Sequence, residues 1–401
     1  MTGAPARLLF DSVSRNTGDI AIGIASRQLL ADLGVDSVIC DPFADDLPSP
    51  LIIGGGELIR SQGDSFYDSF RRPGANILNA VGVWTSADHL DYLNDYEFVS
   101  ARSSREAEVL AAAVPHAEVL PCATTLLRSP HVEIQGVDPG ETVVGIHMVP
   151  HALRMIDDLI PIINAIPHKK VFIPFTHYNS DASFMRALPF DKRNSVFLEP
   201  LAPLELHSIL GQMSYTLVSS LHASIFSYSQ NVPFASVFQT KVKDYFTDRG
   251  LNEHVVSNTE EFRQMILRLD VEKFDFTTLI DDDRKRVQTA FRNYAQIVSS
   301  SMALGPAPAP DLRDHGDPTQ HTDFILGQVG HVVSDRDLAL SYTESRRMAL
   351  AAEVTELTEQ VNRLQRELSA IRNTLPFRAA QAIRRVGRTM LGRFSAVFKR
   401  P

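Results

Sequence analysis

The sequence has few cysteines and no long hydrophobic run. Its 401 residues include two cysteines, Cys40 and Cys122, which are too few for a disulfide framework and are not spaced as metal ligands. No window approaches the roughly 20 apolar residues of a transmembrane helix. The N-terminal residues run directly into a predicted strand rather than a signal peptide. We therefore expect a cytoplasmic protein, either soluble or peripheral on the inner face of the plasma membrane.

Metal and nucleotide motifs are also missing. His147 and His151 have the spacing of a helical metal pair, but Pro150 between them disrupts such a helix. The glycine triplet at 54–56 follows a predicted strand. It lacks both the Lys-Ser/Thr of a P-loop and the spacing of a dinucleotide-binding motif. We expect no metal and no cofactor.

Strand-like and helical stretches alternate in two series, separated by a turn-rich segment at 129–141. The strand-like runs are 7–12, 37–40, 50–56, 76–83 and 96–101, then 142–147, 169–177, 195–200, 215–220 and 233–239. Such alternation is typical of βαβ units and parallel sheets. The sequence thus predicts an α/β fold with two Rossmann-like domains, at 1–130 and 140–303, facing each other across a cleft. A helix from about Asp283 to Met302 closes the second domain and packs back on the body.

Two further segments follow a Pro-rich linker at 304–342. A coiled coil is predicted at 343–375, because its apolar residues are spaced alternately four and three apart, as at the a and d positions of a heptad. They are Leu350, Val354, Leu357, Val361, Leu364, Leu368, Ile371 and Leu375. We expect a homodimer through this segment; the alternative is a single amphipathic helix docked on the body of its own chain.

The tail at 376–401 is basic. From Phe377 onward it contains seven basic residues and no acidic ones, and since the whole chain has a net charge of −9, the preceding 376 residues carry −16. The acidic body should repel nucleic acid, so we expect no nucleic-acid partner. In the tail, apolar residues fall on one helical face, which favours contact with an anionic membrane surface over a solvated or disordered tail.

The ends of the predicted strands provide most of the candidate site residues, because ligands of open α/β sheets bind beyond the carboxyl ends of the strands. In the first domain these residues are Asn16, Asp19, Gly54, Gly55, Gly56 with Glu57, and Arg102. In the second they are His147, His177 with Asp181, His222, Lys241 and Lys243. A strand end is also simply where polar residues reach the surface, so it is their convergence on one edge that indicates a site.

Three of these features have a structural alternative. Asp19 is placed either to cap the helix that starts at Ile20, which we favour, or to act as a carboxylate in the cleft. The glycine triplet either forms a tight turn or lets backbone N–H groups approach an anion. His222 follows Ser219 and Ser220, a predicted N-cap. A helix start lowers the pKa of an imidazole and favours a bound anion, yet from its position alone we favour a capping or core role for His222.

Taken together, four stretches resemble the polysaccharide pyruvyl transferase family over roughly residues 7–260. They are "NTGD" at 16–19, "LIIGGGEL" at 51–58, "FVSARSSREAEVL" at 98–110 and "SLHASIFSYSQNVPFASVFQTKVKDYFTDRGL" at 220–251. The last is similar to the family's Arg-Leu-His-small-small-Ile segment, its Gly-Val-Pro and the lysine before its closing helix.

The resemblance implies a fold similar to GT-B glycosyltransferases. It also implies transfer of the enolpyruvyl unit of phosphoenolpyruvate to hydroxyls of a cell-surface glycan, giving a cyclic pyruvate ketal. By this resemblance His222 is the general acid or a phosphate ligand, and Arg102 and Lys241 bind anions. The glycine triplet and Asp19 would line the cleft.

The chain departs from the family pattern in three places. Ser220 stands where the family has an arginine two residues before the histidine, Ser103 follows Arg102 in place of an aspartate, and Cys122 follows Pro121 where an aspartate is usual. A serine cannot replace the bidentate, charged clamp of an arginine. Either another cation replaces it, namely Lys241, Lys243 or Arg102, or the donor is not phosphoenolpyruvate.

Two rival functions remain beside pyruvyl transfer. One is a glycosyltransferase that uses a nucleotide sugar, for which Glu199 is the candidate carboxylate for the ribose. The other is a catalytically degenerate assembly subunit of a glycan-synthesis complex, tethered to a membrane, which the departures at Ser220 and Cys122 favour.

Overall fold

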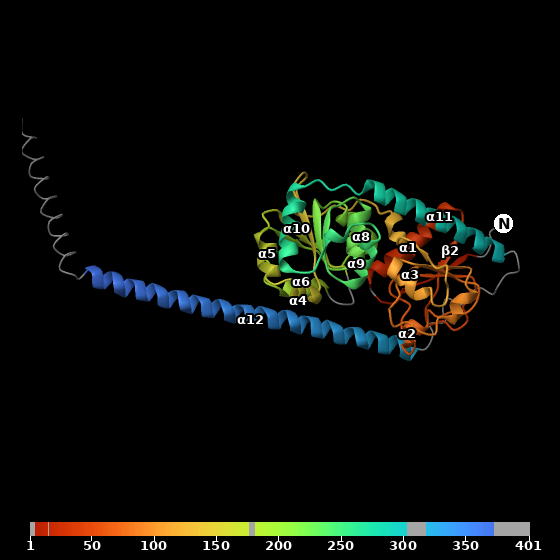
Figure 1. Cartoon of the computed structure of the whole chain (residues 1–401), viewed down its shortest axis with the longest axis horizontal. Helices are drawn as coiled ribbons and strands as arrows, with labels where there is room; N and C mark the ends of the chain where they lie inside the picture. Colours follow the sequence, from red (N-terminus) through yellow and green to blue (C-terminus); the bar gives the residue numbers. More distant parts are fainter. Residues whose placement is uncertain (1–4, 15, 176–180, 303–317, 373–401) are drawn as a thin grey trace, which may run out of the picture. The chain divides into compact units, whose positions relative to one another are not determined.

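The computed structural model describes residues 5–14, 16–175, 181–302 and 318–372, with side chains given for all of these except 301–337, 371 and 372 (Figure 1). The chain forms two compact units, Met1–Leu340 and Ser341–Pro401, and the first contains two six-stranded sheets. Every strand pairing in both sheets is parallel. The prediction of an α/β fold with two parallel sheets is confirmed.

The first sheet has the strand order β2-β1-β3-β4-β5-β6. Its strands are β1 (Ala6–Leu9), β2 (Ser37–Ile39), β3 (Leu51–Gly54), β4 (Ile77–Val81), β5 (Phe98–Ala101) and β6 (Glu118–Val119). The central strands β1, β3 and β4 are buried along their whole length, as expected for a parallel sheet covered on both faces. The order reverses between β1 and β3, since the chain moves to one side for β2 and to the other for β3 onward.

The second sheet has the order β12-β11-β10-β7-β8-β9. Its strands are β7 (Val143–His147), β8 (Lys169–Phe172), β9 (Ser195–Phe197), β10 (Tyr215–Val218), β11 (Phe234–Val237) and β12 (Val255–Val256). This is the Rossmann order 3-2-1-4-5-6, and it reverses between β7 and β10. Strand β8 ends at Phe172, so it is shorter than the strand that the sequence predicts at 169–177.

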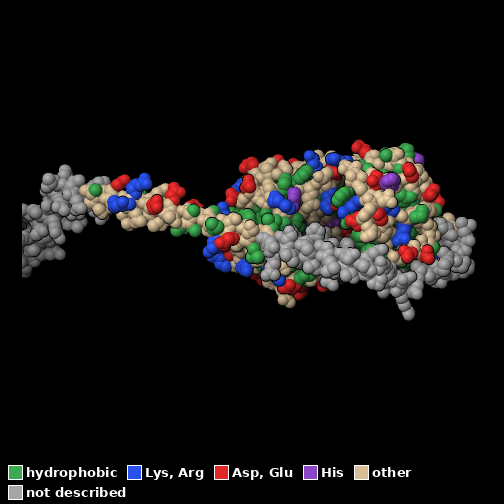
Figure 2. All heavy atoms as spheres, turned by 90° about the horizontal axis from the view of Figure 1, so that it is seen from below, with side chains coloured by type: hydrophobic (Ala, Val, Ile, Leu, Met, Phe, Trp, Pro, Cys, Tyr) green, Lys and Arg blue, Asp and Glu red, His purple; other side chains and the backbone are tan. Residues whose placement is uncertain are grey.

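Helices connect these strands, and the described residues also include three short 3₁₀ helices. The α-helices of the first unit are α1 (Thr17–Asp32), α2 (Ser65–Asp68), α3 (Ser104–Leu110), α4 (Pro150–Met155), α5 (Leu159–Ala165), α6 (Asp181–Ala187), α7 (Pro203–Leu210), α8 (Leu221–Ser229), α9 (Thr240–Thr247), α10 (Thr259–Val271) and α11 (Thr277–Met302). The 3₁₀ helices are η1 (Asp91–Asp95), η2 (Ala123–Leu126) and η4 (Asn252–His254). On the face in Figure 2, acidic and basic side chains are interspersed.

Helix α11 ties the two sheets together. It begins six residues before the predicted Asp283, and Asp283 itself accepts hydrogen bonds from Arg249 at 2.6 Å and Tyr228 at 3.2 Å, both from the second half of the unit. Further along, Tyr294 donates to Asn79 at 3.2 Å and packs edge-on against Phe98, both from the first sheet. The helix therefore packs against both halves of the first unit.

The second compact unit contains most of the long helix α12 (Pro318–Arg372). This helix begins inside the range 304–342 that the sequence assigns to a linker; proline at the first helical position is favourable because its missing N–H would have no partner there. Six of the predicted heptad side chains, from Leu350 to Leu368, are 48–63% exposed on this helix. Leu375 and the basic tail at 376–401 lie outside the described residues, so their predictions stay untested.

Candidate functional site

Both sheets place predicted site residues where their strand order reverses. In the first sheet this point lies between β1 and β3, which are followed by Asp19 and the glycine triplet. In the second it lies between β7 and β10, which lead to His147 and His222. In open parallel sheets a ligand binds in the crevice beyond this reversal point, because the loops on its two sides diverge there.

Asp19 lies inside the first turn of α1 rather than at its cap. The N-cap is Asn16, whose side-chain oxygen accepts from the backbone N–H of Gly18 at 3.2 Å, so the expectation that Asp19 caps this helix is wrong. Asn16 also donates to the Asp19 carboxylate at 2.7 Å. A Cβ on Gly56, whose φ is +71°, would lie 2.8 Å from that carboxylate. Glycine at 56 thus lets the backbone approach Asp19 closely.

Four charged side chains form a network beside Asp19. Arg102 binds Glu106 through Nε at 3.0 Å and Nη2 at 2.8 Å, and its Nη2 also lies 3.3 Å from Glu57. Lys241, from the second half of the unit, lies 3.1 Å from the other oxygen of Glu57. Burial acts against the ionised form of Glu57, but Lys241 and Arg102 lower its pKa to about 2. The two predicted anion-binding cations are therefore each paired with a carboxylate.

His222 packs directly against the start of α1. Its helix α8 is capped by Ser220, whose hydroxyl accepts from the N–H of Ala223 at 3.3 Å, which confirms the predicted cap. A Cβ on Gly18 would lie 2.0 Å from His222 Nδ1, so only glycine fits there. On its other side, His222 Nε2 is 3.8 Å from the sulfur of Cys122. His222, from the second half of the unit, therefore contacts residues of the first half on both sides.

Burial gives Asp19 and His222 opposite pKa shifts. Burial, reinforced by the negative charge of Asp11, raises the pKa of Asp19 to about 7, although Lys241 and Arg102 act to lower it. Burial, reinforced by the positive charges of Arg102 and Lys241, lowers the pKa of His222 to about 3. At neutral pH the carboxyl is therefore close to half protonated and the imidazole is neutral.

His147 lies at the second reversal point but bonds within its own half. Its Nε2 is 2.9 Å from Asp181, and both side chains are fully buried. Its backbone oxygen accepts a hydrogen bond from Ser219 at 3.2 Å, which brings β7 and the start of α8 together. His177, the other predicted histidine of this half, lies outside the described residues.

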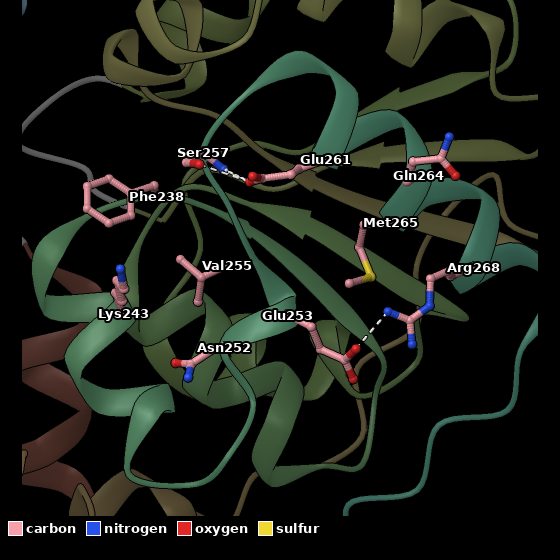
Figure 3. A pocket seen from close by; sticks show the side chains of 10 residues that line it. All are labelled: Phe238, Lys243, Asn252, Glu253, Val255, Ser257, Glu261, Gln264, Met265 and Arg268. Carbon is pink, nitrogen blue, oxygen red and sulfur yellow. Dashed lines mark hydrogen bonds and ion pairs between the residues drawn. The ribbon is translucent and has the colours of Figure 1, made fainter.

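Lys243 is separated from the Lys241 network. It lines a groove of about 520 Å³ with Phe238, and its ammonium lies 5.9 Å from the Phe238 ring centre (Figure 3). Many polar groups of this groove are already paired with each other. Arg268 binds Glu253 at 2.8 Å, and Glu261 accepts from the Ser257 N–H at 2.7 Å, as the dashed lines in Figure 3 show. Glu199, the candidate ribose ligand, is exposed and bound to Arg186 at 2.7 Å.

A second cavity, of about 240 Å³, adjoins the charged network. It is lined by Glu57 and Lys241 together with residues of the loop after β4 and of helices α3 and α9. The lining residues are Glu57, Val83, Trp84, Thr85, Ser86, Arg105, Glu106, Val109, Thr240, Lys241 and Asp244.

Sequence reasoning missed several of these residues as parts of the site. No sequence motif marks Glu106 or Trp84 as a site residue, because nothing in a single sequence shows that they lie beside a lysine more than 130 positions later. Cys122 carried a partial signal: it stands where the family pattern has an aspartate, and its sulfur proves to be in contact with His222. Burial raises the pKa of this thiol.

The family model for polysaccharide pyruvyl transferases matches residues 16–237, which include Asn16, the glycine triplet, Arg102 and His222. The chain belongs to the polysaccharide pyruvyl transferase family. No sequence among curated proteins matches it. As a member of this family it is expected to be a transferase, and the match includes the site residues that follow both reversal points.

Solved structures similar to this pyruvyl transferase family member are distant. A protein of uncharacterised function from Klebsiella pneumoniae is 12% identical, covers 62% of this chain and 90% of its own, and has a TM-score of 0.37. The calicheamicin glycosyltransferase CalG4 is also 12% identical, with coverages of 82% and 99% and a TM-score of 0.33. A UDP-GlcNAc 2-epimerase of Methanocaldococcus jannaschii is 8% identical, with coverages of 67% and 93% and a TM-score of 0.30. These TM-scores support no inference about this chain.

Two kinds of feature are absent from the described ranges. No cluster of three or more His, Cys, Asp or Glu side chains there is placed to hold a metal ion. No helix there combines the length and the apolar character needed to cross a membrane.

Proposed function

We propose that this protein transfers a pyruvyl group from phosphoenolpyruvate to two hydroxyls of a glycan, forming a cyclic ketal on a cell-surface polysaccharide or its precursor. The observation behind the proposal is the pair of opposite pKa shifts at two positions within the family match. Asp19 has a pKa of about 7 and lies in the first turn of α1; His222 has a pKa of about 3 and packs against that turn at Gly18. A group that gives up a proton near neutral pH is what the first step of this chemistry needs.

In this scheme Asp19 is the general acid. Its proton is added to the methylene carbon of phosphoenolpyruvate, and the electron-poor C2 then accepts the oxygen of a first sugar hydroxyl. That hydroxyl's proton returns to the Asp19 carboxylate. Phosphate then leaves, C2 accepts the second hydroxyl, and the second hydroxyl's proton leaves with the phosphate. The sum is one glycan diol and one phosphoenolpyruvate converted to one ketal and one phosphate.

His222 and Lys241 bind the donor. A neutral imidazole donates one hydrogen bond through its N–H, which suits a phosphate or carboxylate oxygen. Lys241 is about one-third exposed and Glu57 about one-quarter, so the ion pair between them is open to a competing anion. The donor's carboxylate or phosphate replaces Glu57 as the partner of Lys241, which supplies the cation missing at Ser220.

Calorimetric titration with phosphoenolpyruvate tests this proposal. We expect the wild-type protein to bind, Lys241→Ala to lose binding, and Lys243→Ala to keep it, because Lys243 sits two residues along the same helix but in a different groove. His222→Ala should weaken binding and His168→Ala, a histidine paired with Asp270 elsewhere, should not. If the protein binds nucleotide sugars but not phosphoenolpyruvate, the proposal is wrong and a glycosyltransferase is favoured. No binding of either donor would favour an assembly subunit.

We also propose how the remaining segments act. The two sheets form two Rossmann-like domains in a GT-B-like arrangement, at 1–130 and 140–303. The heptad residues of α12 form a parallel homodimer. The tail at 376–401, which lies outside the described residues, holds this dimer at an anionic membrane surface through its seven basic residues: Arg378, Arg384, Arg385, Arg388, Arg393, Lys399 and Arg400. Truncation after Leu375 should then abolish partition to anionic vesicles, and unchanged partition would refute membrane attachment.

A further inference from the structure

We infer that the 240 Å³ cavity beside Trp84 is the binding site for one sugar ring of the acceptor glycan, with the Trp84 indole as its stacking platform. The role of this sugar as the acceptor rests on the proposed function, whereas the binding of a sugar to the cavity does not. The only tryptophan of the chain lines this cavity and is 42% exposed, although a large aromatic side chain is normally buried.

The position of Trp84 is fixed by its surroundings. Its backbone N–H donates to Ile59 at 2.9 Å, and its ring is covered on one side by the guanidinium of Arg60, 4.2 Å from the ring centre. Arg60 in turn stacks on Tyr67 at 3.5 Å, and Ser61 ties down the same loop by donating to the Ser86 backbone at 2.7 Å. The exposed part of the indole is therefore held in place before any ligand binds, which lowers the entropic cost of binding.

The cavity combines an apolar platform with polar groups of both charges. Its carboxylates come from Glu57, Glu106 and Asp244, and its cations from Arg105 and Lys241. Arg105 is more than half exposed and lies 3.8 Å from Asp244, which is 16% exposed. Because the charges nearly balance, the cavity offers no net attraction to a strongly charged ligand. A neutral ligand with one apolar face and many hydroxyls suits it, and a hexopyranose has this chemistry.

The cavity also has the right size and neighbours. At 240 Å³ it is below the roughly 300–1,000 Å³ of sites for drug-sized ligands, so it fits one ring of a longer chain rather than a whole oligosaccharide. Glu57 and Lys241 belong both to this cavity and to the charged network beside Asp19. A sugar on Trp84 would thus present its hydroxyls to the place where the donor is proposed to bind.

The single tryptophan makes the inference directly measurable. Methyl glycosides of glucose, galactose, mannose and their N-acetylamino forms are titrated, without any donor, into the full-length protein while Trp84 fluorescence is recorded. At least one of these sugars should change the emission with a saturable dependence on concentration. No saturable change with any sugar, up to the solubility limit of each, would overturn the inference.

Three variants separate this site from general damage, with binding followed by ligand-observed NMR. Trp84→Ala should abolish sugar binding, Trp84→Phe should retain part of it, and Thr85→Tyr should block it by filling the cavity with Trp84 in place. Thr355→Tyr, on α12 in the second compact unit, should leave it unchanged. Retained binding in both Trp84→Ala and Thr85→Tyr would overturn the inference.

Phosphoenolpyruvate binding is measured on the same variants, so the two proposals fail separately. If sugar binding depends on Trp84 but the protein does not bind phosphoenolpyruvate, the sugar site is supported and phosphoenolpyruvate is excluded as the donor. If the wild type binds no sugar and Trp84→Ala still binds phosphoenolpyruvate, the sugar site is removed and the pyruvyl donor stands.

Discussion

Asp19 is buried together with Asp11 and close to Glu57, and this burial sets how its carboxyl behaves with pH. In the folded protein its pKa is raised from 3.8 to about 7, so the native state keeps a proton that the unfolded chain has already lost. The stability from this group is therefore complete below about pH 4 and is lost as the pH rises through 7. His222 behaves in the opposite way, because its pKa is lowered from 6.5 to about 3 in the folded protein. Its contribution to stability is complete above pH 6.5 and is lost as the pH falls towards 3.

Replacing Asp19 by asparagine should remove the pH dependence that this carboxyl creates. Relative to Asp19→Asn, the wild-type protein should lose roughly 1.4 kcal/mol of unfolding free energy for each pH unit between 3.8 and about 7. Urea unfolding of both proteins across this range measures the difference. Wild-type turnover should fall above pH 7 as the acid form disappears, and Asp19→Asn should be inactive at every pH. Parallel stability curves for the two proteins would contradict the raised pKa.

Gly56 and Gly34 provide a matched pair that tests whether the close approach of the backbone at Gly56 to Asp19 matters. Their φ angles are nearly equal, +71° and +73°, but a Cβ on Gly56 meets Asp19 at 2.8 Å whereas one on Gly34 meets nothing within 4 Å. Both substitutions by alanine should cost about 1 kcal/mol of backbone strain. Only Gly56→Ala should also displace the Asp19 carboxylate and abolish transfer. Thermal melts and turnover of the two variants make the comparison; equal activities would show that the close approach at 56 has no catalytic role.

At the scale of elements, the sequence predicted the alternation of strands and helices because buried parallel strands leave continuous apolar runs. It also placed Asp19, the glycine triplet and His222 at strand ends. It did not predict that Asn16 caps α1, since Asn16 and Asp19 are three residues apart and both are good caps. It could not predict that Glu57 meets Lys241 or that Cys122 meets His222, because these contacts depend on how the two sheets pack against each other.

The cap of α8 should matter for the site more than for overall stability. Ser220→Ala removes the hydrogen bond to the Ala223 N–H and should cost about 1 kcal/mol. Asn258→Ala removes the equivalent bond to the Glu261 N–H at the start of α10 and should cost a similar amount. Phosphoenolpyruvate affinity should fall in Ser220→Ala alone, because only α8 holds His222. Equal affinities in calorimetry would argue against a positioned histidine.

At the scale of the whole molecule, the six heptad side chains that the structure describes, Leu350 to Leu368, are exposed to solvent in a single chain. With Val354 and Val361 at a positions, Leu357 and Leu364 are at d positions, and they are 53% and 63% exposed. Leu357→Glu combined with Leu364→Glu should convert a dimer into a monomer in sedimentation velocity, because buried glutamates at d repel each other. Thr355→Glu combined with Asn362→Glu adds the same charges at b positions and should leave the dimer intact. A wild-type monomer would contradict the proposed coiled coil.

Helix α11 bears on how a long polymer reaches the site. The polypeptide passes between the two sheet domains twice, once after η2 and once along α11, which is anchored to both. The two sheets are also joined by one apolar core, which contains Leu8 and Val171 together with Tyr294 of α11. The Lys241–Glu57 and Arg105–Asp244 contacts, at 3.1 and 3.8 Å, join the same two halves. We expect a glycan to reach the cavity from the solvent-exposed side of Trp84, so that sugars in the interior of a chain become substrates without threading from its end.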